Sequence, residues 1–313
     1  MPTLKEIKGR IGSVRSTLKI TSAMELVSSA KLRKAQNAIS AMRPYEEALQ
    51  KMLALAGGAG NGFENVPLPS NKADFAGDGT ENDRLPAVII AIASNSSLCG
   101  GFNSNIIAKV RAVRNEGDVV YSIGRKMADA MARDGFPSPE DYSALSEHPA
   151  YAQAADIVER LSEDFYEGRI SSVKLVYTHF VSTSRQVPVV ETLLPVGETP
   201  DQVGGDVMPD SAPVMPDPGR SVMPDTDRAS DVILEPSAKD LLEELLPRAL
   251  KLKLYAALLD SAAAEHAART IAMQTATDNA ENLLAELTLQ YNKGRQQKIT
   301  SEILDLAGGQ AAE

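Results

Sequence analysis

A glycine-containing turn between a predicted strand and a predicted helix has the residue types that could bind a phosphate group. Residues 98–103 read Leu-Cys-Gly-Gly-Phe-Asn. Phosphates often bind where a strand of an α/β sheet meets the next helix, because backbone N–H groups at a helix N-terminus are free to donate. The sequence contains neither a P-loop motif nor a dinucleotide-binding motif after a strand. Two glycines also serve to close a tight turn, and we favour this packing interpretation.

The histidines and the cysteine form no catalytic pattern in the sequence. His148, His179 and His266 are far apart, and no H-x-x-x-H or H-E-x-x-H pair occurs. His266 falls on an apolar stripe, so we interpret it as a packing histidine with satisfied hydrogen bonds. Cys99 has no local partner that marks it as a nucleophile. A single cysteine excludes an internal disulfide framework and is typical of a reducing compartment. We therefore expect a non-catalytic protein without a cofactor or metal site.

The first of the elements that must position these residues is a long N-terminal helix, predicted over 1–56. Its first apolar residues alternate spacings of three and four, which is the pattern of a coiled-coil seam. These residues are Leu4, Ile7, Ile11, Val14 and Leu18. After them we expect the stripe to shift phase to Ile20, Met24 and Val27. Pro44 should kink or locally break the helix. Residues 57–86 are rich in Gly, Asn, Asp and Pro and predict a loop.

A second long helix is predicted over 236–313, beginning near a capping-box pattern at 237–240. Pro247 lies inside it and should bend it. A four-residue step between His266 and Thr270 interrupts its seam and should locally unwind the supercoil. Gly294 should weaken the helix locally. The seam residues are Leu252, Tyr255, Leu259, Ala262, His266, Thr270, Met273, Thr277, Ala280, Leu284, Leu287 and Tyr291. About 60 uninterrupted helical residues would span roughly 90 Å, so part of this helix must project.

Between the long helices, residues 87–235 predict a small central α/β domain. The unbroken apolar run at 87–93 is typical of a strand buried on both faces of a parallel sheet. Further strands are predicted at 119–123, 173–180 and 187–194, the last two forming a hairpin, with a short one at 232–234. Helices are predicted at 104–114, 125–133 and 151–166. Residues 197–231 repeat Val-Met-Pro-Asp three times and predict a solvated low-complexity insertion.

The expected fold is therefore α/β, with a long antiparallel coiled coil of the two terminal helices and a Rossmann-like sheet domain. The net charge of -10 argues against binding to nucleic acid. Residues 1–53 nevertheless carry ten Lys/Arg against four Glu, which suggests acidic protein partners along the N-terminal helix. The sequence has no run of about 18 apolar residues and no signal-peptide core at its start, so we expect a cytosolic chain.

Several segments resemble the gamma subunit family of F-type ATP synthases. Residues 4–11 (LKEIKGRI) and 20–27 (ITSAMELV) resemble its N-terminal helix. Residues 265–279 (EHAARTIAMQTATDN) and 291–302 (YNKGRQQKITSE) resemble its C-terminal helix even more closely. The turn at 98–103 resembles the turn after the first strand of its central domain. The resemblance covers nearly the whole chain, and the missing targeting features suggest a bacterial member.

The resemblance implies a rotor. In this family the terminal helices fill a ring of three alpha and three beta subunits. The α/β domain sits on a membrane-embedded c-ring beside the epsilon subunit. Proton flow turns the lower ring and, with it, the shaft. The implied location is peripheral, at the cytoplasmic face of the bacterial inner membrane.

The resemblance also implies contacts with the beta subunit. Met24 falls at the position that packs near the lever loop of beta, and Arg269 matches an arginine on the facing part of the C-terminal helix. Arg295 and Gln296 match a pair that hydrogen-bonds a beta loop. Without the resemblance, Met24 would be an ordinary seam residue and the other three an exposed polar face.

Two departures from the family pattern and two alternative functions stay open. Residues 94–97 read Ser-Asn-Ser-Ser where many relatives carry Asp-Arg-Gly, and the insertion at 197–231 is expected on the outer surface of the sheet domain.

One alternative function is that of a freestanding α/β nucleotide-binding protein with helical arms. Another is a plain coiled-coil scaffold, which explains the seams but not the specific C-terminal segments.

We predict that Met24→Lys impairs the coupling between rotation and ATP synthesis more than it impairs folding. The added cation lies beside a basic face and would strengthen one rotary contact over the others. The measurement is ATP synthesis in membranes that carry the variant, compared with the amount of folded protein. A normal synthesis rate would contradict the prediction.

Overall fold

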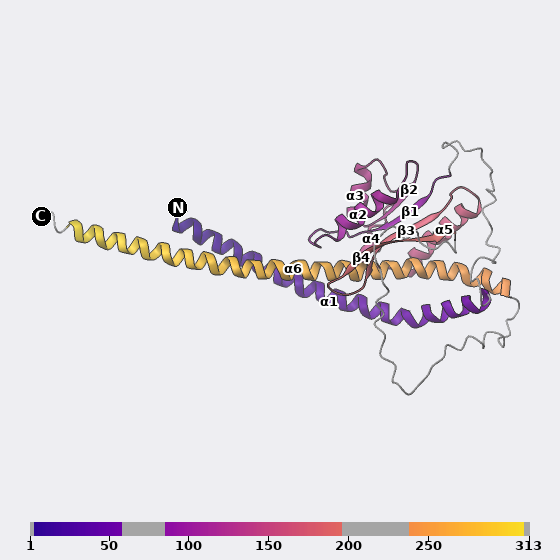
Figure 1. Cartoon of the computed structure of the whole chain (residues 1–313), viewed down its shortest axis with the longest axis horizontal. Coiled ribbons are helices and arrows are strands. Elements are labelled where there is room, and N and C mark those ends of the chain that lie inside the picture. The colour runs from indigo at the N-terminus through magenta and orange to yellow at the C-terminus, as the bar shows by residue number, and fades with distance from the viewer. Residues whose placement is uncertain (1–2, 58–84, 196–237, 310–313) are drawn as a thin grey trace, which may run out of the picture.

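The computed structural model describes residues 3–57, 85–195 and 238–309. Two long helices, α1 (Leu4–Gly57) and α6 (Ala238–Gly309), lie side by side and run in opposite directions, and a small α/β domain rests against one side of α6 (Figure 1). We call the α1–α6 pair the shaft and residues 85–195 the sheet domain. The expected fold, an antiparallel pair of terminal helices with a central α/β sheet, is confirmed.

The two helices of the shaft pack in one register along their shared length. A Cβ added to Gly294 would lie 3.1 Å from the Cδ2 atom of Leu4. Further along, the Thr277 hydroxyl donates to the Thr21 hydroxyl at 3.0 Å. At the far end, Leu49 packs in one cluster with Leu242. Because Leu4 is near the beginning of α1, the last turns of α6 extend beyond α1 (Figure 1).

The seam of α1 differs from the prediction between residues 20 and 28. Ile20 and Val27 are 60% and 57% exposed, whereas Thr21 and Ser28 are only 8% and 3% exposed. The predicted phase shift was wrong, because the alternation of three and four simply continues from Leu18 and places small polar residues in the seam. Thr21 satisfies its hydroxyl by donating to the Leu18 carbonyl at 3.2 Å and accepting from Thr277.

The predicted seam of α6 is confirmed from residue 252 to residue 291, where every predicted position is buried or half-buried. Neither proline breaks its helix, since α1 continues through Pro44 and α6 through Pro247. A proline removes one backbone hydrogen bond. The apolar cluster of Leu49, Leu53 and Leu245 holds the two helices together around these positions.

The sheet domain contains four strands in the order β2-β1-β3-β4. The strands are β1 (Val88–Ile92), β2 (Val119–Ile123), β3 (Val173–Phe180) and β4 (Gln186–Leu194). Strand β1 is parallel to both β2 and β3, whereas β3 and β4 form the predicted antiparallel hairpin. All five residues of β1 are buried, as its apolar run predicts for a central parallel strand.

Helices cover both faces of the sheet. Helices α2 (Phe102–Val113) and α3 (Arg125–Arg133) pack on one face. Helix α5 (Tyr151–Tyr166) and the Leu250–Leu258 part of α6 pack on the other. The sheet domain therefore uses a segment of the shaft to complete its own core. The short helix α4 (Ser143–Glu147) was not predicted from the sequence.

Several sequence predictions fall wholly or partly outside the described residues. These are the loop at 57–86, the insertion at 197–231, the strand at 232–234, the capping box at 237–240 and the outermost residues of the two predicted terminal helices. The proposed division of the chain at 56, 86 and 235 likewise stays a prediction.

We predict that Leu254→Ala destabilises the protein by about 2–5 kcal/mol, because Leu254 is fully buried where α6 closes the core of the sheet domain. Leu289→Ala is the matched control, since the Leu289 side chain lies exposed on the same helix and its truncation should cost less than about 0.5 kcal/mol. Urea unfolding followed by circular dichroism measures both. Equal losses in the two variants would contradict the packing described.

Candidate functional site at the junction of the shaft and the sheet domain

The glycine-containing turn after β1 is packed against the shaft. Cys99 and Phe102 form a buried cluster with Ala264 of α6, and Phe180 of β3 packs against it. A Cβ on Gly100 would lie 3.9 Å from the Cβ of Ala272, so the turn and α6 are in close contact. The packing interpretation of this turn is therefore supported.

Internal hydrogen bonds fix the shape of the turn. The Oδ1 atom of Asn103 accepts from the backbone N–H of Ser94 at 3.1 Å, and its Nδ2 atom donates to the Ser96 carbonyl at 3.3 Å. The Ser94 hydroxyl donates to the same Ser96 carbonyl at 2.6 Å. These contacts hold Leu98 in a left-handed conformation with φ 67° and leave its side chain exposed. A bulky residue adopts this conformation only when its surroundings impose it.

A buried ion pair on α6 reaches across to this turn. The Nη1 atom of Arg269 donates to Oε1 of Glu265 at 2.7 Å, and its Nη2 atom donates to the Ser96 hydroxyl at 2.9 Å and to the Ser97 carbonyl at 3.4 Å. Arg269 is 9% exposed. Burial raises the pKa of Glu265 above its ordinary value, although Arg269 and Lys31 of α1 oppose this change.

Further polar contacts join β3 and β4 to α6. Lys253 lies 3.1 Å from Oε2 of Glu191, whose Oε1 atom accepts from the Tyr177 hydroxyl at 2.8 Å. His179, at the end of β3, pairs with Asp260. The hydrogen bond to the Asp260 carboxylate raises the pKa of His179. The sheet domain is thus tied to α6 at several successive turns of the helix.

His266 differs from the prediction of a satisfied packing histidine. It is half-buried on the seam, as expected, but its Nδ1 atom is buried and has no hydrogen-bond partner in the described part of the chain. Burial, together with the positive charges of Arg269 and Lys31, lowers the pKa of His266 to about 4. The imidazole is therefore neutral near pH 7.

The carboxyl ends of the parallel strands, where α/β sheets usually bind ligands, lie at this junction. A cavity of about 260 Å³ lies there between the turn and α6, lined by Phe102, Pro188 and Ile271 among others. Its lining contains none of the charged side chains that would hold a phosphate. Across residues 3–57, 85–195 and 238–309, no group of three or more His, Cys, Asp or Glu could hold a metal ion.

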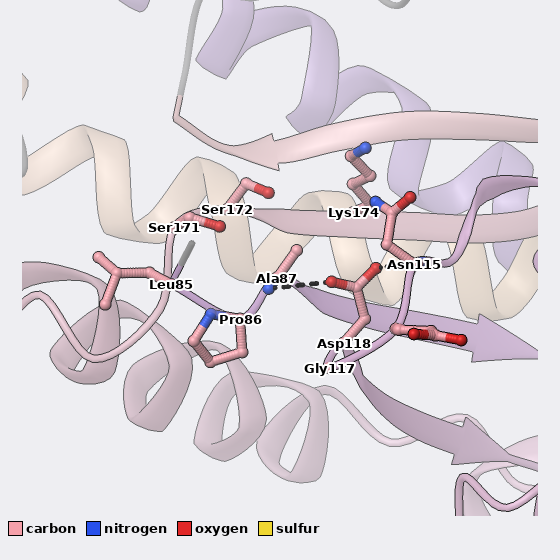
Figure 2. Close-up of a pocket in the computed structure, with 10 residues that line it drawn as sticks. Leu85, Pro86, Ala87, Asn115, Gly117, Asp118, Ser171, Ser172 and Lys174 are labelled. Carbon is pink, nitrogen blue, oxygen red and sulfur yellow. Dashed lines mark hydrogen bonds between the residues drawn. The ribbon is translucent and has the colours of Figure 1, made fainter. Parts of the chain in front are cut away.

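A second pocket, of about 280 Å³, lies at the opposite, amino ends of β1, β2 and β3 (Figure 2). Asp118 lines it, but its carboxylate already accepts from the backbone N–H groups of Ala87 at 3.2 Å and Asn115 at 2.8 Å. Lys174 is the cation of its lining. Glu116 also lines the pocket. The Asp118 carboxylate closes the local turns through its two backbone hydrogen bonds.

The four predicted contact residues lie at three separate places on the shaft. Met24 is half-buried beside the seam of α1. Arg269 is buried at the junction, which differs from the exposed face expected of an ordinary polar residue. Arg295 and Gln296 are exposed just beyond Gly294, where α6 has passed the beginning of α1. Their contacts with a beta subunit stay predictions. Residues 94–97 depart from the family pattern, but nothing in the sequence predicted that Ser96 is the partner of Arg269.

These features define a class of protein, an elongated helical shaft that carries a small α/β domain. A family model described as ATP synthase matches residues 3–312. The ATP synthase gamma chain of Phocaeicola vulgatus is 41% identical over 319 residues, with 100% of each chain covered. That of Flavobacterium johnsoniae is 36% identical over 324 residues, covering 100% of this chain and 99% of the relative. The chain belongs to the ATP synthase gamma chain family, and it is a non-catalytic subunit.

Solved structures share the fold. A chain in the Euglena gracilis mitochondrial ATP synthase (OSCP, F1 and c-ring, rotational state 3) aligns with a TM-score of 0.64 at 16% identity, covering 99% of this chain and 94% of that one. A chain from the central stalk and c-ring of the Tetrahymena thermophila mitochondrial ATP synthase gives a TM-score of 0.52 at 20% identity, covering 82% and 99%. Within the described residues, no helix is long and apolar enough to cross a membrane.

We predict opposite pH effects for two histidines. The His179–Asp260 pair stabilises the folded protein below the ordinary histidine pKa of about 6.5, and this stabilisation is lost as pH rises through the raised folded value. His179→Gln should therefore lower the melting temperature at about pH 5.5 and leave it unchanged at about pH 9. The loss should stay below about 1 kcal/mol, because His179 is half-exposed.

His266 should act in the other direction. Its folded pKa is lowered, so the unfolded chain takes up a proton first and stability falls as pH drops from about 6.5 towards 4. His266→Gln should flatten this part of the stability curve. Thermal unfolding of both variants across the range provides the measurement. Parallel curves for wild type and His266→Gln would contradict the assignment.

Proposed function

We propose that the chain is the central rotor shaft of a proton-translocating F-type ATP synthase, which couples c-ring rotation to the conformational cycle of the catalytic beta subunits. The observation that supports this most directly is the antiparallel packing of α1 on α6, with the sheet domain tied to α6 at one end and α6 projecting beyond α1 at the other (Figure 1). This shape suits transmission of rotation over a distance.

A shaft can drive chemistry only if it contacts the three beta subunits unequally, because equal contact with every conformation would shift no equilibrium. The exposed apolar side chains of the shaft are unevenly distributed over its surface. Exposed apolar side chains lie on α1 at Ile20, Leu26 and Val27, with a second group at Tyr45, Met52 and Leu55, and another set lies on the last part of α6. Exposed apolar groups of this kind mark contact with protein partners.

Charge supports the same assignment of partners. The ten Lys/Arg of residues 1–53 give α1 a basic surface on an acidic protein. Exposed ion pairs are weak, at about 0–1 kcal/mol each, so contacts between this surface and acidic loops of a surrounding ring can form and break as the shaft turns. The alpha and beta subunits are the proposed partners of the shaft, and the epsilon subunit and c-ring those of the sheet domain.

The proposed location follows from the proposed assembly. The chain would be held at the cytoplasmic face of the bacterial inner membrane through the c-ring, without spanning the bilayer itself. The gamma chains of Phocaeicola vulgatus and Flavobacterium johnsoniae, which cover the chain from end to end, support a bacterial enzyme of this kind.

The two alternative functions predict different behaviour. A nucleotide-binding protein would bind or hydrolyse ATP when purified alone, whereas a rotor shaft would do neither. A plain scaffold would tolerate charge reversal at the exposed Arg295 without loss of ATP synthesis. Charge reversal at Arg269 would place a second carboxylate beside buried Glu265 under either function, so Arg295 is the discriminating position.

The experiment is reconstitution of the chain with alpha and beta subunits from the same genome. We expect ATP hydrolysis to turn a bead attached to exposed Asp129 of the sheet domain, with a dwell for each of the three beta subunits. A chain lacking residues 295–309 is the comparison, because it removes the projecting part of α6 and should weaken retention in the ring. Failure of the full chain to assemble, or ATP hydrolysis without rotation, would contradict the proposal.

A further inference from the structure

The sheet domain holds the shaft mainly through α6. Helix α6 has extensive contacts with β3 and α5, and it supplies Leu250, Leu254 and Leu258 to the core of the domain. Helix α1 packs against α6, and its contribution at the junction is small, with Leu32 in a cluster that Phe180 also contacts. Any turning force applied to the sheet domain therefore passes first into α6 and reaches α1 through the seam.

Arg269 lies near the point where α6 leaves the sheet domain. The cavity at the junction is lined by Ile271 and Ala272, and from Met273 onward the buried residues of α6 follow its seam with α1. A rod that is held at one end carries its largest bending and twisting load where it leaves its support. The polar contact of Arg269 with the turn is thus placed at the mechanically critical part of the shaft.

Apolar packing at this place offers little resistance to rotation of α6 about its own axis. The α6 residue that packs on Cys99 and Phe102 of the turn is small, since it is the fully buried Ala264. Ala263 and Ala267 are also fully buried, in a cluster with Leu32 of α1 that Phe180 contacts. Small side chains of this kind interdigitate less than large ones would. A guanidinium is different, because its planar donors fix direction as well as distance. Arg269 uses one nitrogen on Glu265 of its own helix and another on Ser96 of the turn.

We propose that Arg269 is a positioning residue that locks the angle between the shaft and the sheet domain through its contacts with Glu265 and Ser96. Glu265 holds the guanidinium in the plane that lets Nη2 reach Ser96, and the Asn103 hydrogen bonds hold Ser96 in place. The consequence for torque rests on the proposed rotor function, but the lock itself is a property of the isolated chain.

The first test measures the lock in the purified full chain. Spin labels at Asp129→Cys on α3 and Asn282→Cys on α6 report the distance between the two parts; both positions are exposed, and native Cys99 is buried. Arg269→Gln and Ser96→Ala should each broaden the distance distribution, by about twofold. The double variant should be no broader than Arg269→Gln alone, because both changes break one contact.

Arg248→Gln is the matched control. Arg248 pairs with Glu244 on the same helix at the same four-residue spacing, but both side chains are exposed and distant from the turn. The control should leave the distribution unchanged. Arg269→Lys should give an intermediate width, since a single ammonium can keep the charge opposite Glu265 but cannot hold two partners in a fixed plane. Ser96→Ala keeps the test valid even if Arg269→Gln folds poorly.

The second test uses the assembled enzyme. Ser96→Ala should leave unloaded ATP hydrolysis within about twofold of wild type, and both Ser96→Ala and Arg269→Gln should reduce the torsional stiffness measured from angular fluctuations of a bead on the sheet domain. A purely stabilising role would lower the amount of assembled enzyme and leave its stiffness unchanged. Failure of wild type to assemble would count against the rotor function, whereas unbroadened distributions in both variants would overturn the lock. Broadening by Arg269→Gln without any effect of Ser96→Ala would also overturn it.

Discussion

The packing of α1 against α6 is the interaction on which the rest of the structure depends. Neither helix could stay ordered over such a length in water with its apolar stripe exposed. The shared register, marked by Leu4 at Gly294 and Thr21 at Thr277, determines where the shaft is double and where α6 continues alone. Outer apolar residues of α1 such as Ile20 and Val27 remain exposed because the seam is filled by others.

The sheet domain shows how a fold that often binds nucleotides can serve a mechanical purpose. Its strand order and parallel core are those of an α/β domain, but one face of its sheet is completed by α6. The carboxyl edge, which is a ligand site in many relatives of this architecture, packs its glycine-containing turn on the shaft through Cys99, Phe102 and Ala264. The function of this domain therefore depends on the packing of α6 against the carboxyl edge of the sheet, not on the fold alone.

Polar groups in the seam lower stability and increase specificity. Thr21 and Ser28 occupy buried seam positions where apolar residues are usual in a coiled coil. The Nδ1 atom of His266 is left without a hydrogen-bond partner among the described residues. Buried polar residues in coiled coils are best known for fixing register and partner, at a cost in stability. The hydrogen bond between Thr277 and Thr21 is satisfied in the observed register, and a shift of one turn would break it.

The sequence by itself determined the local elements. The bounds of β2, α3, α5 and β3 agree with prediction, because strand and helix periodicity and the adjoining turn residues are properties of short segments. It also determined the family, through long specific segments of α6. Only the tertiary structure decided that Thr21 and Ser28, not Ile20 and Val27, face α6. The apolar side chains of Ile20 and Val27 favoured these two residues for the seam. The register of the whole helix pair places Thr21 and Ser28 there instead. Tertiary structure alone also paired Arg269 with Ser96, 173 residues away, since no local pattern encodes a contact between such distant segments.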